Sequence, residues 1–194
     1  MKEKILKEFK ESISVKDKFI QGHVDAVLEV SKAIANTFSE GNKVILFGNG
    51  GSASDASHIA GEFVNRFKRE RPGLPAIALN TDMAVITSIA NDYDYSEIFA
   101  RQLKALAAEG DMIIAITTSG NSPNVLKAVD VAKKKKLKTV VFTGSKGEKL
   151  ASKATYSFVV PSDNTPRIQE THITLGHVLC LMVEEILFEE PRKK

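Results

Sequence analysis

The sequence lacks most of the features that mark specialised classes of protein. Its 194 residues include no tryptophan, one cysteine and six prolines, and the formal net charge is +3. The lone cysteine, Cys180, excludes an internal disulfide, which fits a reducing compartment. Its apolar, helical surroundings favour a buried thiol over a catalytic one. We therefore expect a cytoplasmic protein with a conventional hydrophobic core.

The charge pattern does not indicate a nucleic-acid partner. The densest basic run, residues 133–136 followed by Lys138, lies at the end of an expected helix, where cations complement the helix dipole. The small net charge gives no broad basic surface for a phosphate backbone. We expect no nucleic-acid binding.

Long hydrophobic runs are also absent. Residues 1–11 interleave charged and apolar side chains, unlike a secretory signal or a membrane anchor. The longest apolar segment, residues 173–188, is interrupted by His177, Glu184 and Glu185, and its apolar residues recur with helical spacing. The sequence predicts a packed helix here rather than a membrane span.

What the sequence does contain is the alternation of an α/β protein. Hydrophobic residues make up 43% of the chain and charged residues 26%, which is ordinary for one globular domain. Segments rich in Val and Ile, with the composition of strands buried on both faces, alternate with helical segments. We predict a doubly wound parallel five-stranded sheet in a single domain, residues 1–194, with a helical segment, residues 1–40, used for packing or oligomerisation, before a core, residues 41–194.

The expected elements follow from this periodicity. Residues 5–38 are helical in pattern and predict two helices that meet near residues 14–17, with Gly41 and Asn42 as the stop signal. Strands are expected over residues 43–47, 75–79, 112–116, 138–142 and 156–160. Further helices are expected over residues 54–67, 82–90, 95–107, 123–135 and 147–152, and a long one from Pro166 onward.

A glycine-rich loop follows the first expected strand. Residues 48–52 read Gly-Asn-Gly-Gly-Ser, and glycines here allow the backbone to approach a ligand closely. The free N–H groups at the start of the next helix favour an anion, so a phosphate is the expected ligand. His58 and Glu62 follow on that helix and, being four residues apart, share one face about 40° wide. This segment therefore combines an anion site with residues suited to acid–base or metal chemistry.

A second loop with the same character follows the third strand. Residues 117–122 read Thr-Thr-Ser-Gly-Asn-Ser and precede Pro123, which fits the first position of a helix with Ser122 as its N-cap. The hydroxyls either bind a phosphate or serve only to turn the chain and cap the helix. Because ligands of doubly wound sheets lie beyond the carboxyl ends of the strands, the two loops together favour the binding site.

A dinucleotide site is the main rival interpretation of the first loop. Gly48, Gly50 and Ala53 satisfy the loose pattern G-x-G-x-x-G/A. However, the acid expected about 20 residues later would have to be Asp82, which is too far along the chain. Neither loop carries the Gly-Lys-Ser/Thr of a nucleotide-binding P-loop. We expect no nucleotide cofactor.

The C-terminal helix carries polar residues on an otherwise apolar segment. With Gln169 set at 0°, His172 falls at about −60° and His177 at about +80°, so the two histidines are unlikely partners in one site. Periodicity alone does not choose between them, and either could be a core residue with a satisfied hydrogen bond.

Five motifs, in order along the chain, resemble the phosphoheptose isomerases of the SIS (sugar isomerase) domain family. They are GNGGSASDASHIAGEF, RPGLPAIALNTD, IANDYDYSEIFARQ, TTSGNSPNVLKAV and RIQETHITLGH. The resemblance implies a flavodoxin-like SIS fold and the conversion of sedoheptulose 7-phosphate to D-glycero-D-manno-heptose 7-phosphate. This reaction supplies heptose for bacterial lipopolysaccharide.

The resemblance also implies roles for individual residues. Glu62 and His177 are the expected acid–base pair of an aldose–ketose isomerisation through an enediol. The helix histidine chosen by the family pattern is thus His177, and His172 becomes structural. Thr117, the first residue of the second loop, stands where the family often has serine, and threonine keeps the hydroxyl. The expected substrate-binding residues are Asn49, Gly50, Gly51, Asn91, Asp92, Thr117, Thr118, Ser119, Ser122 and Gln169.

Members of this family resemble zinc proteins, and the resemblance also suggests a tetramer. The residues matching their metal ligands are His58, Glu62, Gln169 and His177, of which glutamine is an uncommon zinc ligand. The implied assembly is a homotetramer with sites near subunit boundaries. The alternative function is a non-catalytic SIS domain that binds a sugar phosphate and a partner protein such as the replication initiator; the presence of both Glu62 and His177 favours the enzyme.

Overall fold

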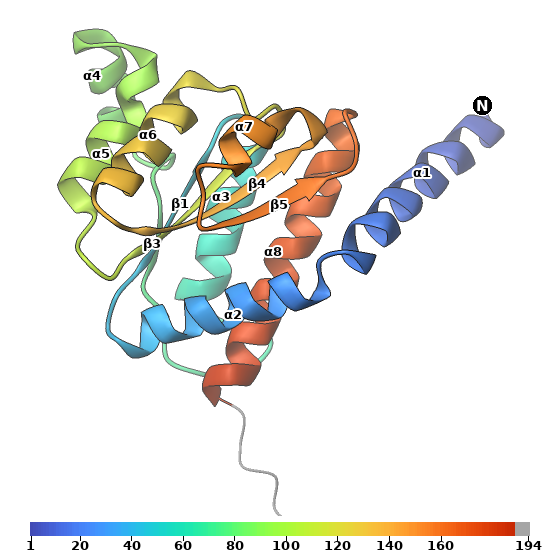
Figure 1. Ribbon diagram of the computed structural model, residues 1–194, viewed down its shortest axis with the longest axis horizontal. Coiled ribbons are helices and arrows are strands. Elements are labelled where there is room, and N and C mark those ends of the chain that lie inside the picture. The colour runs from blue at the N-terminus through green and yellow to red at the C-terminus, as the bar shows by residue number, and fades with distance from the viewer. Residues whose placement is uncertain (189–194) are drawn as a thin grey trace, which may run out of the picture.

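The computed structural model, which describes residues 1–188, contains one parallel sheet with helices on both faces (Figure 1). Its five strands lie in the order β2-β1-β3-β4-β5, the order of a doubly wound fold. The predicted α/β fold class is confirmed. The strands are β1 (Val44–Gly48), β2 (Ala76–Ala78), β3 (Met112–Thr117), β4 (Lys138–Gly144) and β5 (Tyr156–Val160).

The helices follow the predicted alternation with shifts of a few residues at their ends. The α-helices are α1 (Lys2–Gln21), α2 (Val24–Ser39), α3 (Gly51–Val64), α4 (Met83–Asp92), α5 (Ile98–Leu106), α6 (Pro123–Lys134), α7 (Glu148–Ala151) and α8 (Thr165–Phe188). Short 3-10 turns, η1 (Tyr95–Glu97) and η2 (Ser145–Gly147), precede α5 and α7.

The sheet separates two hydrophobic clusters because side chains alternate along each strand. In β1, Val44 and Leu46 face the cluster formed with α2, α3 and α8, whereas Ile45 and Phe47 face the cluster formed with α5 and α6. All five residues of β1 are buried. Burial on both faces explains why the strands are continuous apolar runs rather than alternating ones.

The predicted junction between the N-terminal helices was wrong. The chain stays helical through residues 14–17, and α1 ends at Gln21, with Gly22 and His23 forming the break before α2. Val15 and Phe19 are buried within α1, so packing continues across the segment that the polar residues had marked as a boundary. Gly22 has a lower helix propensity than the residues at positions 14–17, and α1 ends before it.

The first half of α1 extends away from the sheet and its covering helices (Figure 1). Ile5, Phe9 and Ile13 on this helix are 58%, 69% and 66% exposed. Such a row of large apolar side chains on one exposed helix indicates a surface that contacts another molecule.

The C-terminal helix α8 is a core helix. Among residues 1–188 it is the one helix long and apolar enough to suit a membrane span, but it packs against α2 and α3, and its side chains from Ile168 to Val183 join the core. Cys180 is fully buried there, and burial raises the pKa of its thiol well above the ordinary value. The thiol is a packing group.

His172 lies inside the core beneath the end of β4. It is completely buried beside Phe142, and its Nε2 lies 3.3 Å from the carbonyl oxygen of Thr143. Burial lowers the pKa of His172 from 6.5 to about 4, against a smaller opposing effect of the hydrogen bond to Thr143. The imidazole is therefore neutral in the folded protein at neutral pH.

This burial makes stability depend on pH. Between pH 7 and pH 5 the histidine takes up a proton in the unfolded chain but not in the folded one, so acidification favours unfolding. With the pKa lowered from 6.5 to about 4, we expect His172 to remove about 2 kcal/mol of stability over this range. Urea unfolding of the wild type and His172→Leu at both pH values, at one protein concentration, measures this. Equal losses of stability in the two proteins would contradict it.

Candidate functional site

The loops after β1 and β3 lie side by side because these strands are neighbours in the sheet, with Gly48 in register with Ile116. Asn49 Nδ2 donates to Asn124 Oδ1 at 2.9 Å, and Asn124 Nδ2 donates back to Asn49 Oδ1 at 2.9 Å. This reciprocal amide pair fixes the first loop to the start of α6. The two predicted phosphate loops thus form one continuous edge at the switch point of the sheet.

Backbone geometry requires glycine in both loops. Gly50 has φ of +55° and Gly120 has φ of +66°, a region that other residues rarely adopt. A Cβ on Gly51 would lie 2.2 Å from Nε2 of Gln169. The amide of Gln169 on α8 therefore covers the first loop, as its expected role in substrate binding would require.

The hydroxyl groups of the second loop face the same edge. Thr117 is 4% exposed, and its Oγ1 lies 3.4 Å from the Oγ of Ser122. Ser122 occupies the N-cap position of α6, as predicted, but its side chain makes no capping hydrogen bond. Thr118 is partly buried and Ser119 is exposed. The Ser122 hydroxyl is therefore not used to cap the helix.

Asn91 and Asp92 lie apart from these loops. Both residues are exposed at the end of α4, where Asn91 Nδ2 donates to Asp92 Oδ1 at 2.9 Å. Helix α4 contacts η1, and Tyr95 of η1 donates to Asn49 at 3.2 Å, so the connection to the first loop is indirect. Their assignment to substrate binding stays a prediction.

A second group of polar side chains forms where α3 packs against α8. Nε2 of His58 lies 3.1 Å from Oε1 of Glu62 and 2.9 Å from Nε2 of His177, and the two imidazole rings are 4.9 Å apart. One potential ligand atom from each residue lies within 4.8 Å of the others. The carboxylate and the imidazole expected to share the chemistry are thus brought together within a single chain.

Close helix packing creates this cluster. A Cβ on Gly176 would lie 2.4 Å from Cδ1 of Ile59, so α8 and α3 are in close contact at this level, and any larger residue would require the Ile59 side chain to shift. Ile59 is adjacent to His58, and Gly176 is adjacent to His177. The close contact of the two helices therefore lies directly beside the two histidines.

The donor set suits a zinc ion. Two imidazoles and one carboxylate are the ligands of many catalytic zinc sites, which keep a fourth position open. Tetrahedral ligation with Zn–N distances of about 2.0–2.1 Å separates two nitrogens by about 3.3 Å. The observed Nε2–Nε2 distance of 2.9 Å needs a small opening of the cluster. His58 Nε2 has at most one hydrogen for two close neighbours, which also fits convergence on a cation.

Gln169 lies at the other end of the site from this cluster. Its amide contacts Gly51, which precedes His58 by seven residues of α3, or about 10 Å along the helix axis. Gln169 and His177 are eight residues apart on α8, about 12 Å along the helix axis. The assignment of Gln169 as a metal ligand stays a prediction, as do the roles of the other site residues.

Several residues near the site escaped the sequence reasoning. Asn124 carries the amide pair, and Phe67 stacks on His177 with ring centroids 5.6 Å apart. Asp55 lies one turn before His58; burial raises its pKa to about 6, although the charge of His58 lowers it in part. Its proximity to His58 on α3 was a usable signal, whereas Asn124 and Phe67 have no local pattern.

Comparisons with known proteins identify the family of this chain. A family described as "SIS domain" matches residues 9–144. A phosphoheptose isomerase of Thermodesulfovibrio yellowstonii is 64% identical over 194 residues, covering 100% of this chain and 96% of the relative. A phosphoheptose isomerase of Aquifex aeolicus is 52% identical over 97% of this chain and 99% of its own length.

A solved structure of a phosphoheptose isomerase from Francisella tularensis has the same fold. Its TM-score is 0.90 at 39% identity, and the match covers 94% of this chain and 97% of that one. Identity at this level over nearly the full length extends beyond the shared sheet to the helices that carry the site. The chain belongs to the SIS domain family and, within it, to the phosphoheptose isomerases.

Proposed function

We propose that this chain interconverts sedoheptulose 7-phosphate and D-glycero-D-manno-heptose 7-phosphate in the cytoplasm, for the synthesis of lipopolysaccharide heptose. The observation that carries the proposal is the convergence of Glu62 and His177 beside a pair of loops suited to phosphate. The family match and the full-length similarity to phosphoheptose isomerases support it.

The dimensions of the site fit a linear sugar with its phosphate at the far end. The glycine loop lies at the N-terminus of α3, and His58 follows about 10 Å further along that helix. An open-chain heptose phosphate reaches from the loop, where helix N–H groups favour the anion, to the polar cluster, where C1 and C2 react. In this arrangement the hydroxyls of Thr117 and Ser122 hold the phosphate oxygens, together with the backbone of Gly50 and Gly51.

The isomerisation moves two protons and no other atoms. A carboxylate removes a proton from C1 of the ketose while the C2 carbonyl oxygen gains one, which gives an enediol. The enediol then loses the proton of the C1 oxygen and gains one at C2, which gives the aldose. We assign the carbon-bound proton to Glu62 and the oxygen-bound protons to His177.

Zinc ligation and proton transfer compete for the same side chains. His58, Glu62 and His177 would hold the ion. Gln169, whose amide lies beside Gly51, would have to turn toward them to add the further ligand that the family resemblance implies. A bound zinc ion polarises sugar oxygens and stabilises the negative charge that develops on them. Oε1 of Glu62 faces His58, so the second carboxylate oxygen is the one assigned to the sugar carbon.

The proposed assembly is a homotetramer in which the single SIS domain, residues 1–194, packs through its N-terminal helices. The exposed side chains of Ile5, Phe9 and Ile13 form an apolar row on α1. Ile13 also lines an adjoining apolar hollow of about 380 Å³, together with Phe19 of α1 and Leu175 of α8. In the proposed tetramer, the apolar surface of one chain would pack against that of another chain, so that both are buried.

Replacing Glu62 with glutamine tests the catalytic assignment. The amide cannot accept the carbon-bound proton, so we expect kcat to fall at least a hundredfold, within the usual range for a general base of about 10²–10⁴. Binding of the sugar phosphate should persist because the phosphate loops are untouched. Isomerase assays on sedoheptulose 7-phosphate measure the first effect, and calorimetric titration with substrate measures the second.

Glu70 supplies the matched control for this substitution. Its side chain is 91% exposed and pairs only loosely with Arg66, at 3.4 Å. Glu70→Gln should keep wild-type turnover. Undiminished kcat in Glu62→Gln would refute the assignment, and absence of turnover in the wild type would leave the sugar-phosphate binding module as the function.

Metal removal tests the role of zinc. If His58, Glu62 and His177 hold an ion needed for turnover, prolonged treatment with a chelator followed by desalting should abolish isomerase activity, and added Zn²⁺ should restore it. Elemental analysis before and after treatment gives the metal content of each sample. Full activity in protein shown to contain no metal would remove zinc from the proposed mechanism.

A charge on α1 tests the proposed assembly. Phe9→Asp places a carboxylate in the apolar row and should shift the protein from tetramers toward smaller species in analytical ultracentrifugation, because the charge would lose its hydration in the interface. Lys7→Asp is the control, since Lys7 lies about 160° around the helix from Phe9. A wild type that sediments as a monomer would contradict the proposal, as would an unchanged tetramer in Phe9→Asp.

A further inference from the structure

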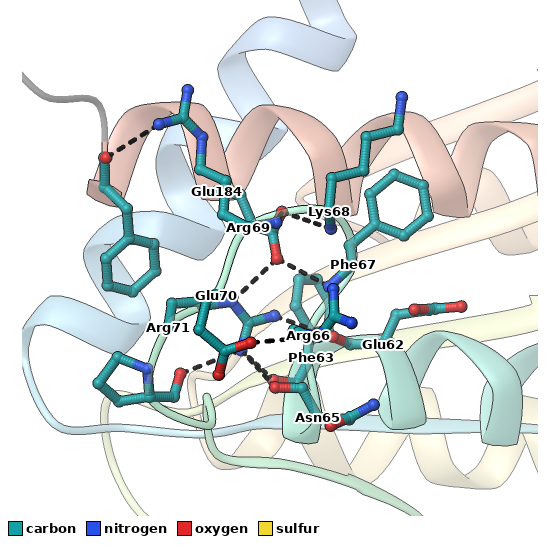
Figure 2. Close-up of polar contacts among 12 residues, drawn as sticks. Glu62, Phe63, Asn65, Arg66, Phe67, Lys68, Arg69, Glu70, Arg71 and Glu184 are labelled. Atoms are coloured by element: carbon teal, nitrogen blue, oxygen red, sulfur yellow. Dashed lines mark hydrogen bonds and ion pairs between the residues drawn. The ribbon is translucent and has the colours of Figure 1, made fainter.

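A buried carboxylate holds the segment that leaves α3. Glu184 on α8 is fully buried, and its side chain accepts hydrogen bonds from three consecutive backbone N–H groups (Figure 2). The donors are Phe67 at 2.8 Å, Lys68 at 2.9 Å and Arg69 at 3.1 Å. Three aligned N–H groups on one carboxylate fix the position of this loop against the helix.

Arg71 links the same carboxylate to the end of α3. Its Nε donates to Oε1 of Glu184 at 3.0 Å. Its Nη2 donates to the carbonyl oxygen of Glu62 at 2.8 Å, and its Nη1 donates to that of Phe63 at 2.7 Å. These carbonyls belong to the last turn of α3, where acceptors lack partners within the helix and attract a cation.

Both ends of the ion pair connect to the reactive cluster. Arg71 bonds the backbone of Glu62 itself, one of the two proposed proton carriers. Glu184 fixes the backbone of Phe67, whose ring stacks on His177 at an interplanar angle of 25°. Glu184 also follows His177 by seven residues, about two turns along the same face of α8. The pair therefore contacts α3 at Glu62 itself and is part of α8 two turns beyond His177.

We propose that Glu184 and Arg71 are positioning residues that set the geometry of Glu62 relative to His177, an inference that rests on the isomerase function proposed above. Neither side chain contacts the sugar site. They act by tying the last turn of α3, the loop that carries Phe67 and the second half of α8 into one rigid unit. Small errors in such geometry lower catalytic rates strongly, because proton transfer needs hydrogen-bond reach.

The chemistry of the pair favours positioning over simple stabilisation. Removing two charges from water costs several kcal/mol per ion, so well-packed apolar residues often stabilise a fold as well or better. What the ion pair adds here is a set of directional hydrogen bonds. Glu184 accepts four hydrogen bonds, three from the loop backbone and one from Arg71. Apolar side chains would fill the same space without fixing those atoms.

Glu184→Gln removes one acceptor from this network and gives its amide a donor that opposes the backbone N–H groups. We expect kcat to fall about 10- to 100-fold with KM changed less than threefold, and the zinc affinity to weaken about 10- to 100-fold, the usual effect of disturbing groups that orient ligands. Steady-state kinetics at 25 °C and competition with a chromophoric chelator measure the two effects. Circular dichroism melting confirms that each protein is folded at the assay temperature.

Glu184→Asp keeps the charge and tests the inference if the glutamine variant does not fold. Its carboxylate is withdrawn by one methylene, which shifts the loop or stretches its hydrogen bonds, and a smaller loss in the same direction is expected. Glu185→Gln is the matched control, because the neighbouring Glu185 bonds the same loop from the surface, through Nη2 of Arg69 at 2.8 Å. The control should keep wild-type kcat and zinc affinity.

The outcomes separate this inference from the function on which it rests. Variants that melt earlier but keep wild-type kcat and zinc affinity would show a purely structural pair and overturn the inference. If the wild type binds zinc but shows no turnover, the zinc affinities of the variants decide. If it turns over without zinc, their kcat values decide. A wild type with neither property overturns the proposed function, and the positioning role falls with it.

Discussion

The close approach of α3 and α8 is the constraint on which the rest of the site depends. Gly176 favours it, because a Cβ there would require the Ile59 side chain to shift. His58 and His177 are each adjacent in sequence to one of these two residues, so an apolar contact between the helices lies directly beside the imidazoles. The helices also close the sheet on one face, and the same packing therefore serves the core and the polar cluster.

The fold was predictable because parallel sheets impose strong local patterns. Apolar runs such as that of β1, Val44–Gly48, must be buried on both faces, and glycines such as Gly50 mark turns that need positive φ. The junction between α1 and α2 was not predictable in the same way. Buried contacts of Val15 and Phe19 outweighed the polar residues between them, and tertiary packing leaves no separate mark in local sequence.

The site also combines features that could be predicted from the sequence with features that could not. Its loops and the spacing of His58 and Glu62 could be predicted from local sequence, since a strand, a glycine turn and a helix face are short-range features. His177 could be selected over His172 only through family resemblance, because both suit a helix. The structure supplies a physical reason for the difference: His172 lies beneath β4 with its Nε2 toward Thr143, whereas His177 faces α3. The amide pair of Asn49 and Asn124 spans the two loops and has no periodicity to detect.

The exposure of the His58, Glu62 and His177 cluster bears on the proposed assembly. The side chain of His58 is 49% exposed and that of Glu62 is 26% exposed, although an enediol reacts cleanly only where water is largely excluded. Within one chain, therefore, the cluster has its geometry but not its enclosure. The apolar row of α1 is likewise exposed, with Ile5, Phe9 and Ile13 at 58%, 69% and 66%. In the proposed tetramer, solvent access to the cluster would be set by the neighbouring copies as well as by the chain that carries it.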